Sequence, residues 1–90
     1  MKKQRGPRGR NWKIDERKII YSMVAKGSDL DSINSTLQNY QNAVGYSNRQ
    51  VPQSSYDIMR GPYLPYIVDA VTRDDFARKP PPMGKLKHHK

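Results

Sequence analysis

Residues 15–37 read DERKIIYSMVAKGSDLDSINSTL, and this stretch decides the fold. Its first half carries apolar residues at helical spacing, namely Ile19, Ile20, Met23 and Val24. These residues share one face of a helix, so we expect a helix over residues 15–26. Lys26 followed by Gly27 ends it, because a cation complements the carboxyl end of the helix dipole and glycine readily adopts the left-handed conformation beyond the last turn.

A second helix is expected directly after this turn. Its apolar residues, Leu30, Ile33 and Leu37, are separated by three and four positions, which is again the spacing of one helical face. Ser28 or Asp29 can cap its amino end, as Asp15 or Asn11 can cap that of the first helix.

Residues 38–50 are polar and rich in asparagine and glutamine, with Tyr40 and Tyr46 as candidate stacking or packing groups. No clear helix stop precedes Gly45, so the second helix can end anywhere between Leu37 and Ala43. We interpret this stretch as a long connection that can contain an extension of the second helix.

Two shorter helices are expected beyond the connection. Pro52 suits the first position of a third helix over residues 52–60, which Gly61-Pro62 ends. Helical spacing predicts a fourth over residues 66–76, with a short strand as the alternative there. The sequence therefore predicts an all-α fold, a small bundle of three to four helices. Its expected core is Ile20, Met23, Ile33 and Leu37, packed against Tyr56 and Met59.

The chain has 90 residues, no cysteine and a formal net charge of +9. This length excludes a large multi-domain enzyme, and the lack of cysteine excludes disulfides, thiolate nucleophiles and cysteine-ligated zinc. Residues 1–13 carry six basic side chains and residues 77–90 carry five, both without acids, whereas residues 14–76 carry six basic side chains and all eight acids. We expect a helical domain over residues 14–76, flanked by two basic arms, the second rich in proline, that are disordered until they bind a polyanion.

This layout resembles the homeodomain-like or Myb-like helix-turn-helix group. Its elements are a helix, a glycine turn, a second helix with Leu30, Ile33 and Leu37, and a third helix that begins beside an arginine. Trp12 is similar to the tryptophan that often opens the first helix of Myb-like repeats. The resemblance covers about residues 11–60 and implies that the third helix lies in the major groove of DNA. It assigns base reading to Gln53, Ser54 and Ser55, with Arg49 on a phosphate or a guanine edge.

The segment Pro7-Arg8-Gly9-Arg10 resembles the Arg-Gly-Arg core of AT-hook arms. In those arms two arginines flank a glycine that is thin enough to lie in a narrow minor groove. The resemblance implies binding to the minor groove or to the duplex backbone. RNA binding, or no specific role, remains open because short Arg-Gly clusters also occur in RNA-binding and disordered segments.

The sequence offers few residues in patterns typical of catalysis or metal binding. The adjacent acids Asp15 with Glu16 and Asp74 with Asp75 point in different directions on a helix, so we interpret them as caps or solvated groups rather than acid–base pairs. His88 and His89 lack carboxylate or thiolate neighbours, and we interpret them as additional charge rather than a metal site. We expect no enzymatic activity, no cofactor and no bound metal.

No apolar run approaches the length of a membrane span, and no secretory signal pattern opens the chain. We expect a soluble protein of the cytoplasm, or of the host-cell cytoplasm if it is viral.

The leading hypothesis is a small DNA-binding regulatory protein, with RNA as the less favoured ligand, of the size common among bacteriophage or bacterial accessory regulators. The expected contact residues are Lys2, Lys3, Arg5, Arg8, Arg10, Arg49, Gln53, Ser54, Arg60, Lys79, Lys85 and Lys87. The alternative is an interaction protein, such as a phage inhibitor of a host protein or a virion component, whose near-neutral bundle docks on a protein. Tyr56, Tyr63 and Tyr66 either form that docking surface or complete a small core.

Overall fold

The computed structural model describes residues 12–77. The predicted basic arms fall mainly on residues 1–11 and 78–90, which lie outside the described part of the chain, so their disorder stays a prediction.

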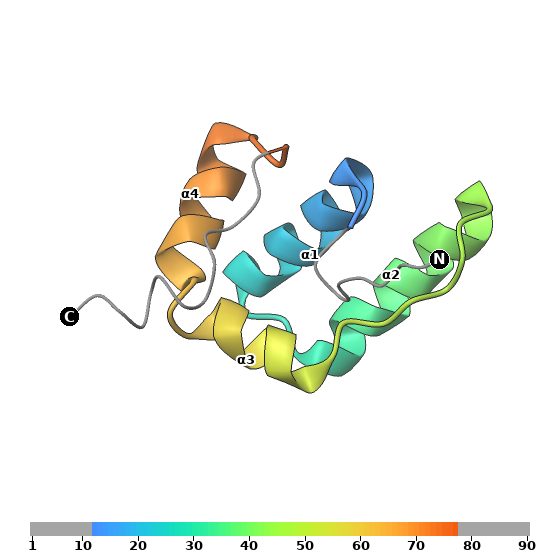
Figure 1. Ribbon diagram of the computed structural model, residues 1–90, viewed down its shortest axis with the longest axis horizontal. Coiled ribbons are helices and arrows are strands. Elements are labelled where there is room, and N and C mark those ends of the chain that lie inside the picture. Colours follow the sequence, from blue (N-terminus) through green and yellow to red (C-terminus); the bar gives the residue numbers. More distant parts are fainter. Residues whose placement is uncertain (1–11, 78–90) are drawn as a thin grey trace, which may run out of the picture.

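Four α-helices make up most of the described residues. They are α1 (Ile14–Lys26), α2 (Leu30–Val44), α3 (Gln53–Arg60) and α4 (Leu64–Arg73). Between residues 12 and 77 there is no β-strand, so the alternative of a strand near the fourth helix is wrong. The predicted all-α bundle of three to four helices is confirmed. Figure 1 shows α1 between α4 and α2, with α3 crossing beneath them and packing on α1 and α4.

The amino end of α1 differs from the expected one. Lys13 occupies the N-cap position, and its backbone N–H donates to the Glu16 carboxylate at 3.2 Å. The expectation that Asp15 or Asn11 caps the helix is therefore wrong, because an acid inside the first turn supplies the acceptor. The carboxyl end is confirmed: Gly27 has a φ of 87°, and the Ser28 N–H donates to the Met23 carbonyl.

The helix α2 begins as predicted and ends later. The Asp29 side chain accepts from the Ser32 backbone N–H at 3.3 Å. At the other end α2 runs to Val44 and stops at Gly45, whose φ is 82°. The expected extension of this helix into the polar stretch is therefore confirmed, whereas the expected end between residues 37 and 43 is wrong. The polar turn around Gln41 stays helical because that glutamine is fully buried against α1.

Residues 45–52 run back along α2, which Figure 1 shows as the trace beside that helix. The Asn34 side chain accepts from the Val51 N–H at 2.7 Å and donates to the Val51 carbonyl at 3.3 Å. The Asn34 side-chain amide thus provides hydrogen-bond partners for both the N–H and the carbonyl of Val51, which is itself buried. The connection is shorter than the predicted residues 38–50.

The last two helices are shifted relative to their expected limits. Pro52 is the N-cap of α3 rather than its first residue, and α3 ends at Arg60 as expected. The helix α4 starts at Leu64, with Pro65 in its first turn, rather than at Tyr66. It stops at Arg73 because Asp74 takes the left-handed conformation, with a φ of 54°. This turn directs Phe76 back onto the core, where it is buried.

The core packs against α4, whereas the expected core packed against α3. The buried apolar residues are Ile20, Tyr21, Val24, Ile33, Leu37, Val51, Ile67, Ala70 and Phe76. The expected burial of Ile20, Ile33 and Leu37 is thus confirmed, whereas Met23, Tyr56 and Met59 are only half-buried. No residue of the short α3 is buried, while α4 buries Ile67 and Ala70 completely and packs extensively on α1.

Candidate nucleic-acid interface

Of the three residues predicted to read bases, Gln53 and Ser54 lie on the outside of α3, whereas Ser55 is half-buried. Gln53 and Ser54 are exposed in its first turn. The Gln53 Nε2 donates to the Asp57 carboxylate at 2.9 Å, one helical turn away. A nucleic acid that approaches this face meets an acid beside the glutamine, so base reading by these residues stays a prediction.

Arg49 lies on the connection before α3, beside the start of the described chain. Its guanidinium carbon is 4.0 Å from the centroid of the Trp12 ring, in a cation–π contact. The Arg49 backbone N–H donates to the buried side chain of Gln41 at 3.1 Å. These contacts place a cation next to the point where the amino-terminal basic segment joins the fold.

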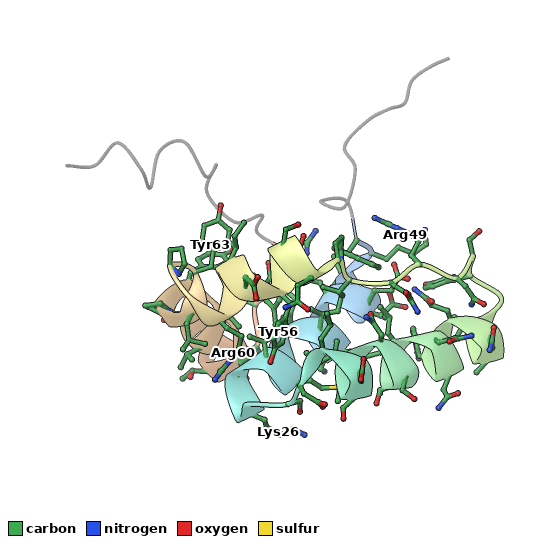
Figure 2. All side chains as sticks on the ribbon, turned by 90° about the horizontal axis from the view of Figure 1, so that it is seen from below. Lys26, Arg49, Tyr56, Arg60 and Tyr63 are labelled. Carbon is green, nitrogen blue, oxygen red and sulfur yellow. The ribbon has the colours of Figure 1, made fainter. Side chains whose placement is uncertain are left out.

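Arg60 is turned to a different side of the molecule. Its Nη1 donates to the Val24 carbonyl in the last turn of α1 at 3.1 Å. Figure 2 shows Arg60 near Lys26 on the lower side of the helices, whereas Arg49 lies on their upper side. The fold therefore does not bring these two predicted contact residues together, and the described contact of Arg60 is structural.

Arg17 joins the two ends of the described chain, a role that no pattern in the sequence predicted. The side chain is buried, with 4% of its surface exposed. Its Nη2 donates to the Trp12 carbonyl at 3.1 Å, while its Nη1 donates to the carbonyls of Phe76 and Ala77. The points where both basic segments leave the fold are therefore held at one guanidinium group.

A second polar cluster surrounds the amino end of α1. The Asp15 carboxylate accepts hydrogen bonds from the hydroxyls of Tyr40 and Tyr46, the latter at 2.8 Å. The Lys13 ammonium lies 5.0 Å from the centroid of the Tyr46 ring. The interpretation of these tyrosines as packing groups is confirmed, since the two rings meet edge to face.

Glu16 and Gln41 form a buried pair behind this cluster. Gln41 Nε2 donates to Glu16 Oε2 at 2.8 Å, and the glutamine oxygen accepts from the Arg49 backbone. The interpretation of Glu16 as a capping group is confirmed, and the carboxylate also anchors α2 and the connection to α1.

The Asp15 cluster makes stability depend on pH. Hydrogen bonds from Tyr40 and Tyr46 lower the pKa of Asp15 below its ordinary value of 3.8. A lowered folded-state pKa stabilises the fold at neutral pH, and that contribution disappears as the pH falls through the folded pKa. The same contact raises the pKa of Tyr40 to about 12. The stability that the protonated Tyr40 hydroxyl contributes is therefore fully present below pH 10 and is lost as the pH rises through about 12.

We therefore expect Tyr40→Phe to lower the free energy of unfolding at neutral pH. The difference from the wild type should shrink as Asp15 becomes protonated below its lowered pKa. Urea unfolding of both proteins at neutral and strongly acidic pH measures this change. A difference that does not vary with pH would contradict the assignment of the Tyr40 hydroxyl to Asp15.

Tyr56, Tyr63 and Tyr66 pack as half-buried rings against the core. The Tyr56 hydroxyl donates to the Ser28 carbonyl at 2.9 Å, and the Tyr63 and Tyr66 centroids are 6.5 Å apart. Tyr66 also meets the buried Tyr21 ring edge to face. Their expected role in completing the core is confirmed, and a protein contact stays a prediction.

The remaining predicted contact residues lie outside the described residues. These are Lys2, Lys3, Arg5, Arg8, Arg10, Lys79, Lys85 and Lys87. The described part, residues 12–77, holds seven basic and eight acidic side chains, so its own charge is close to neutral. No helix within it combines the length and apolar character that a membrane crossing requires. Among residues 12–77 no group of three or more acidic or histidine side chains gathers to bind a metal.

Comparison with known proteins gave no match. No protein-family model matches the chain, and no curated protein or solved structure is significantly similar to it.

Proposed function

We propose that this chain is a small nucleic-acid-binding protein, with DNA as its preferred ligand, that holds the phosphate backbone with two basic segments rooted at one point. The observation that supports the proposal is the set of hydrogen bonds from Arg17 to Trp12, Phe76 and Ala77. Ten of the seventeen basic residues and none of the acids lie in residues 1–11 and 78–90. Because both basic segments leave the fold beside Arg17, we expect them to bind the same stretch of a polyanion.

The energetics of this binding come mainly from counterion release. Each lysine or arginine that neutralises a phosphate releases condensed cations, so affinity falls steeply with salt. The near-neutral helical domain adds little long-range attraction, and Arg49 extends the basic region onto the fold. A regulatory role in the cytoplasm, with sequence preference from the Arg8-Gly9-Arg10 segment and from α3, is part of this proposal.

Arg8 and Arg10 in the amino-terminal segment should contribute measurably to the affinity for duplex DNA. Replacing Arg8 and Arg10 by Ala is expected to reduce the slope of log affinity against log salt by about two, one phosphate contact each. The loss should be larger on A·T-rich duplexes, whose narrow minor groove concentrates negative potential. Anisotropy titrations on A·T-rich and G·C-rich duplexes at several salt concentrations measure both effects. An unchanged slope would contradict a role of this pair in backbone binding.

A capture experiment with the full chain separates this function from docking on a protein. Tagged protein is incubated with lysate before and after nuclease treatment, and the recovered material is analysed. Nucleic acid recovered only from untreated lysate supports the proposal, and titration on duplex DNA, single-stranded DNA and RNA then ranks the ligands. Recovery of one protein partner after nuclease treatment, with no binding to any oligonucleotide, would support the interaction protein instead.

A further inference from the structure

Four aromatic rings form a row that runs back along α4 from the end of the described chain. The rings belong to Phe76, Tyr21, Tyr66 and Tyr63 in that order, and successive centroids are 6.2, 6.3 and 6.5 Å apart. Phe76 and Tyr21 are buried, whereas Tyr66 and Tyr63 are half-buried. Figure 2 shows Tyr63 on the upper side of the helices. The row therefore leads from the core to a pair of rings that reach the surface near the amino end of α4.

The segment that carries this ring pair is uncharged. Residues 61–68 contain no charged side chain, and Pro62 and Pro65, beside the two tyrosines, are exposed. Aromatic rings that line a surface bind proline-rich segments, which dock as extended polyproline II helices. Tyr63 and Tyr66 therefore suit a run of prolines.

A run of prolines lies a short distance further along the same chain. Arg17 holds the carbonyls of Phe76 and Ala77, so the chain leaves the fold at the first ring of the row. Residues 80–82 are three consecutive prolines. At the polyproline II rise of about 3.1 Å per residue, they lie about 9–16 Å along the chain from Ala77. Two steps of the row lead from Phe76 to Tyr66, so this length is sufficient for the prolines to reach the ring pair.

Charge also favours the chain's own carboxyl-terminal segment as the occupant. Residues 53–77, which include α3 and α4, carry four acidic and two basic side chains. Residues 78–90 carry five lysine or arginine side chains and no acid. The segment is therefore attracted to this part of the fold, whereas a second copy of the chain would bring a net charge of +9 against another +9.

We propose that residues 80–82 dock on the rings of Tyr63 and Tyr66 within the same chain. A run of prolines loses little conformational entropy on docking, because polyproline II is already extended. The short tether gives the segment an effective concentration in the millimolar range, so an intrinsic Kd of about 1 mM is sufficient for substantial occupancy. The inference goes beyond the proposed function and does not depend on nucleic-acid binding.

The direct test is NMR spectroscopy of the full chain. Nuclear Overhauser effects should connect the proline protons of residues 80–82 with the ring protons of Tyr63 and Tyr66. Isotope-filtered spectra of mixed labelled and unlabelled chains detect contacts between copies alone, and these spectra should not contain the proline–tyrosine contacts. Absence of the contacts from the full chain, or their appearance between copies, would overturn the inference.

A triple variant removes the proline run and keeps every basic residue. It combines Pro80→Gly, Pro81→Gly and Pro82→Gly. The ring signals of Tyr63 and Tyr66 should shift relative to the wild type, and a peptide of residues 77–84 added to this variant should reverse the shift with a Kd of about 1 mM. Ring signals that are identical in the wild type and the triple variant would contradict the docking.

The matched control is the double variant Lys85→Ala and Lys87→Ala. It should leave the tyrosine ring signals unchanged, because the prolines remain, while it reduces the salt dependence of duplex binding. The triple glycine variant should show the opposite result, with shifted ring signals and an unchanged salt dependence. Failure of the docking and failure of the proposed function are therefore seen in different measurements.

Discussion

Arg17→Met is expected to lower the free energy of unfolding by about 2–4 kcal/mol, since three carbonyl groups lose a charge-assisted donor. Those carbonyls belong to Trp12, Phe76 and Ala77, and the methionine keeps much of the buried side-chain volume. Urea denaturation followed by circular dichroism measures the loss.

The neighbouring Lys18→Met is the matched control. The Lys18 Nζ lies 3.9 Å from the Asp74 carboxylate, and both side chains are largely exposed, at 61% and 77%. Exposed pairs of this kind contribute about 0–1 kcal/mol, so this variant should remain close to the wild type. Equal stability of the two variants would mean that Arg17 does not hold the chain ends together.

Ile67→Ala should have the largest effect of any single substitution discussed, at about 2–5 kcal/mol, because a fully buried side chain leaves a cavity. A domain of this size has a total stability of only a few kcal/mol to about 10 kcal/mol, so the variant can be substantially unfolded at room temperature. Thermal unfolding followed by circular dichroism measures the change.

Met59→Ala tests whether α3 contributes less to the core than α4 does. This methionine is only half-buried, and its truncation should cost about 1 kcal/mol. A Met59→Ala loss that exceeds the Ile67→Ala loss would place the core against α3 rather than α4.

The local features of the fold could be predicted from the sequence. The glycine end of α1, the Asp29 cap of α2 and the burial of Ile33 and Leu37 depend on neighbours within a few positions. Periodicity and capping chemistry report such short-range relations. The position of α4 as the principal partner of α1 could not be predicted in this way, because it depends on how four amphipathic faces share one core.

The polar residues of the candidate site could not be predicted for the same reason. Arg17 and Glu16 have the sequence context of exposed helix charges, yet both are buried. Their partners are distant along the chain: Arg17 donates to Phe76, 59 positions away, and Glu16 accepts from Gln41, 25 positions away. One available signal was that Gln41 falls four residues after the apolar Leu37, on the same helical face.

The proposed function has two consequences for variants of the basic segments. The amino-terminal pair Arg8 and Arg10 and the carboxyl-terminal pair Lys85 and Lys87 each contribute two positive charges. If both segments bind one stretch of DNA from a common root, each pair of alanine substitutions removes about two phosphate contacts, and the two losses add.

The most direct measurement is the salt dependence of duplex binding for the wild-type chain, each of these double variants and the combined fourfold variant. Each double variant should reduce the slope of log affinity against log salt by about two and the combined variant by about four, with circular dichroism showing the helical domain intact. A wild-type protein that is folded but does not bind the duplex at physiological salt, or binds it with no salt dependence, would contradict nucleic-acid binding through the basic segments.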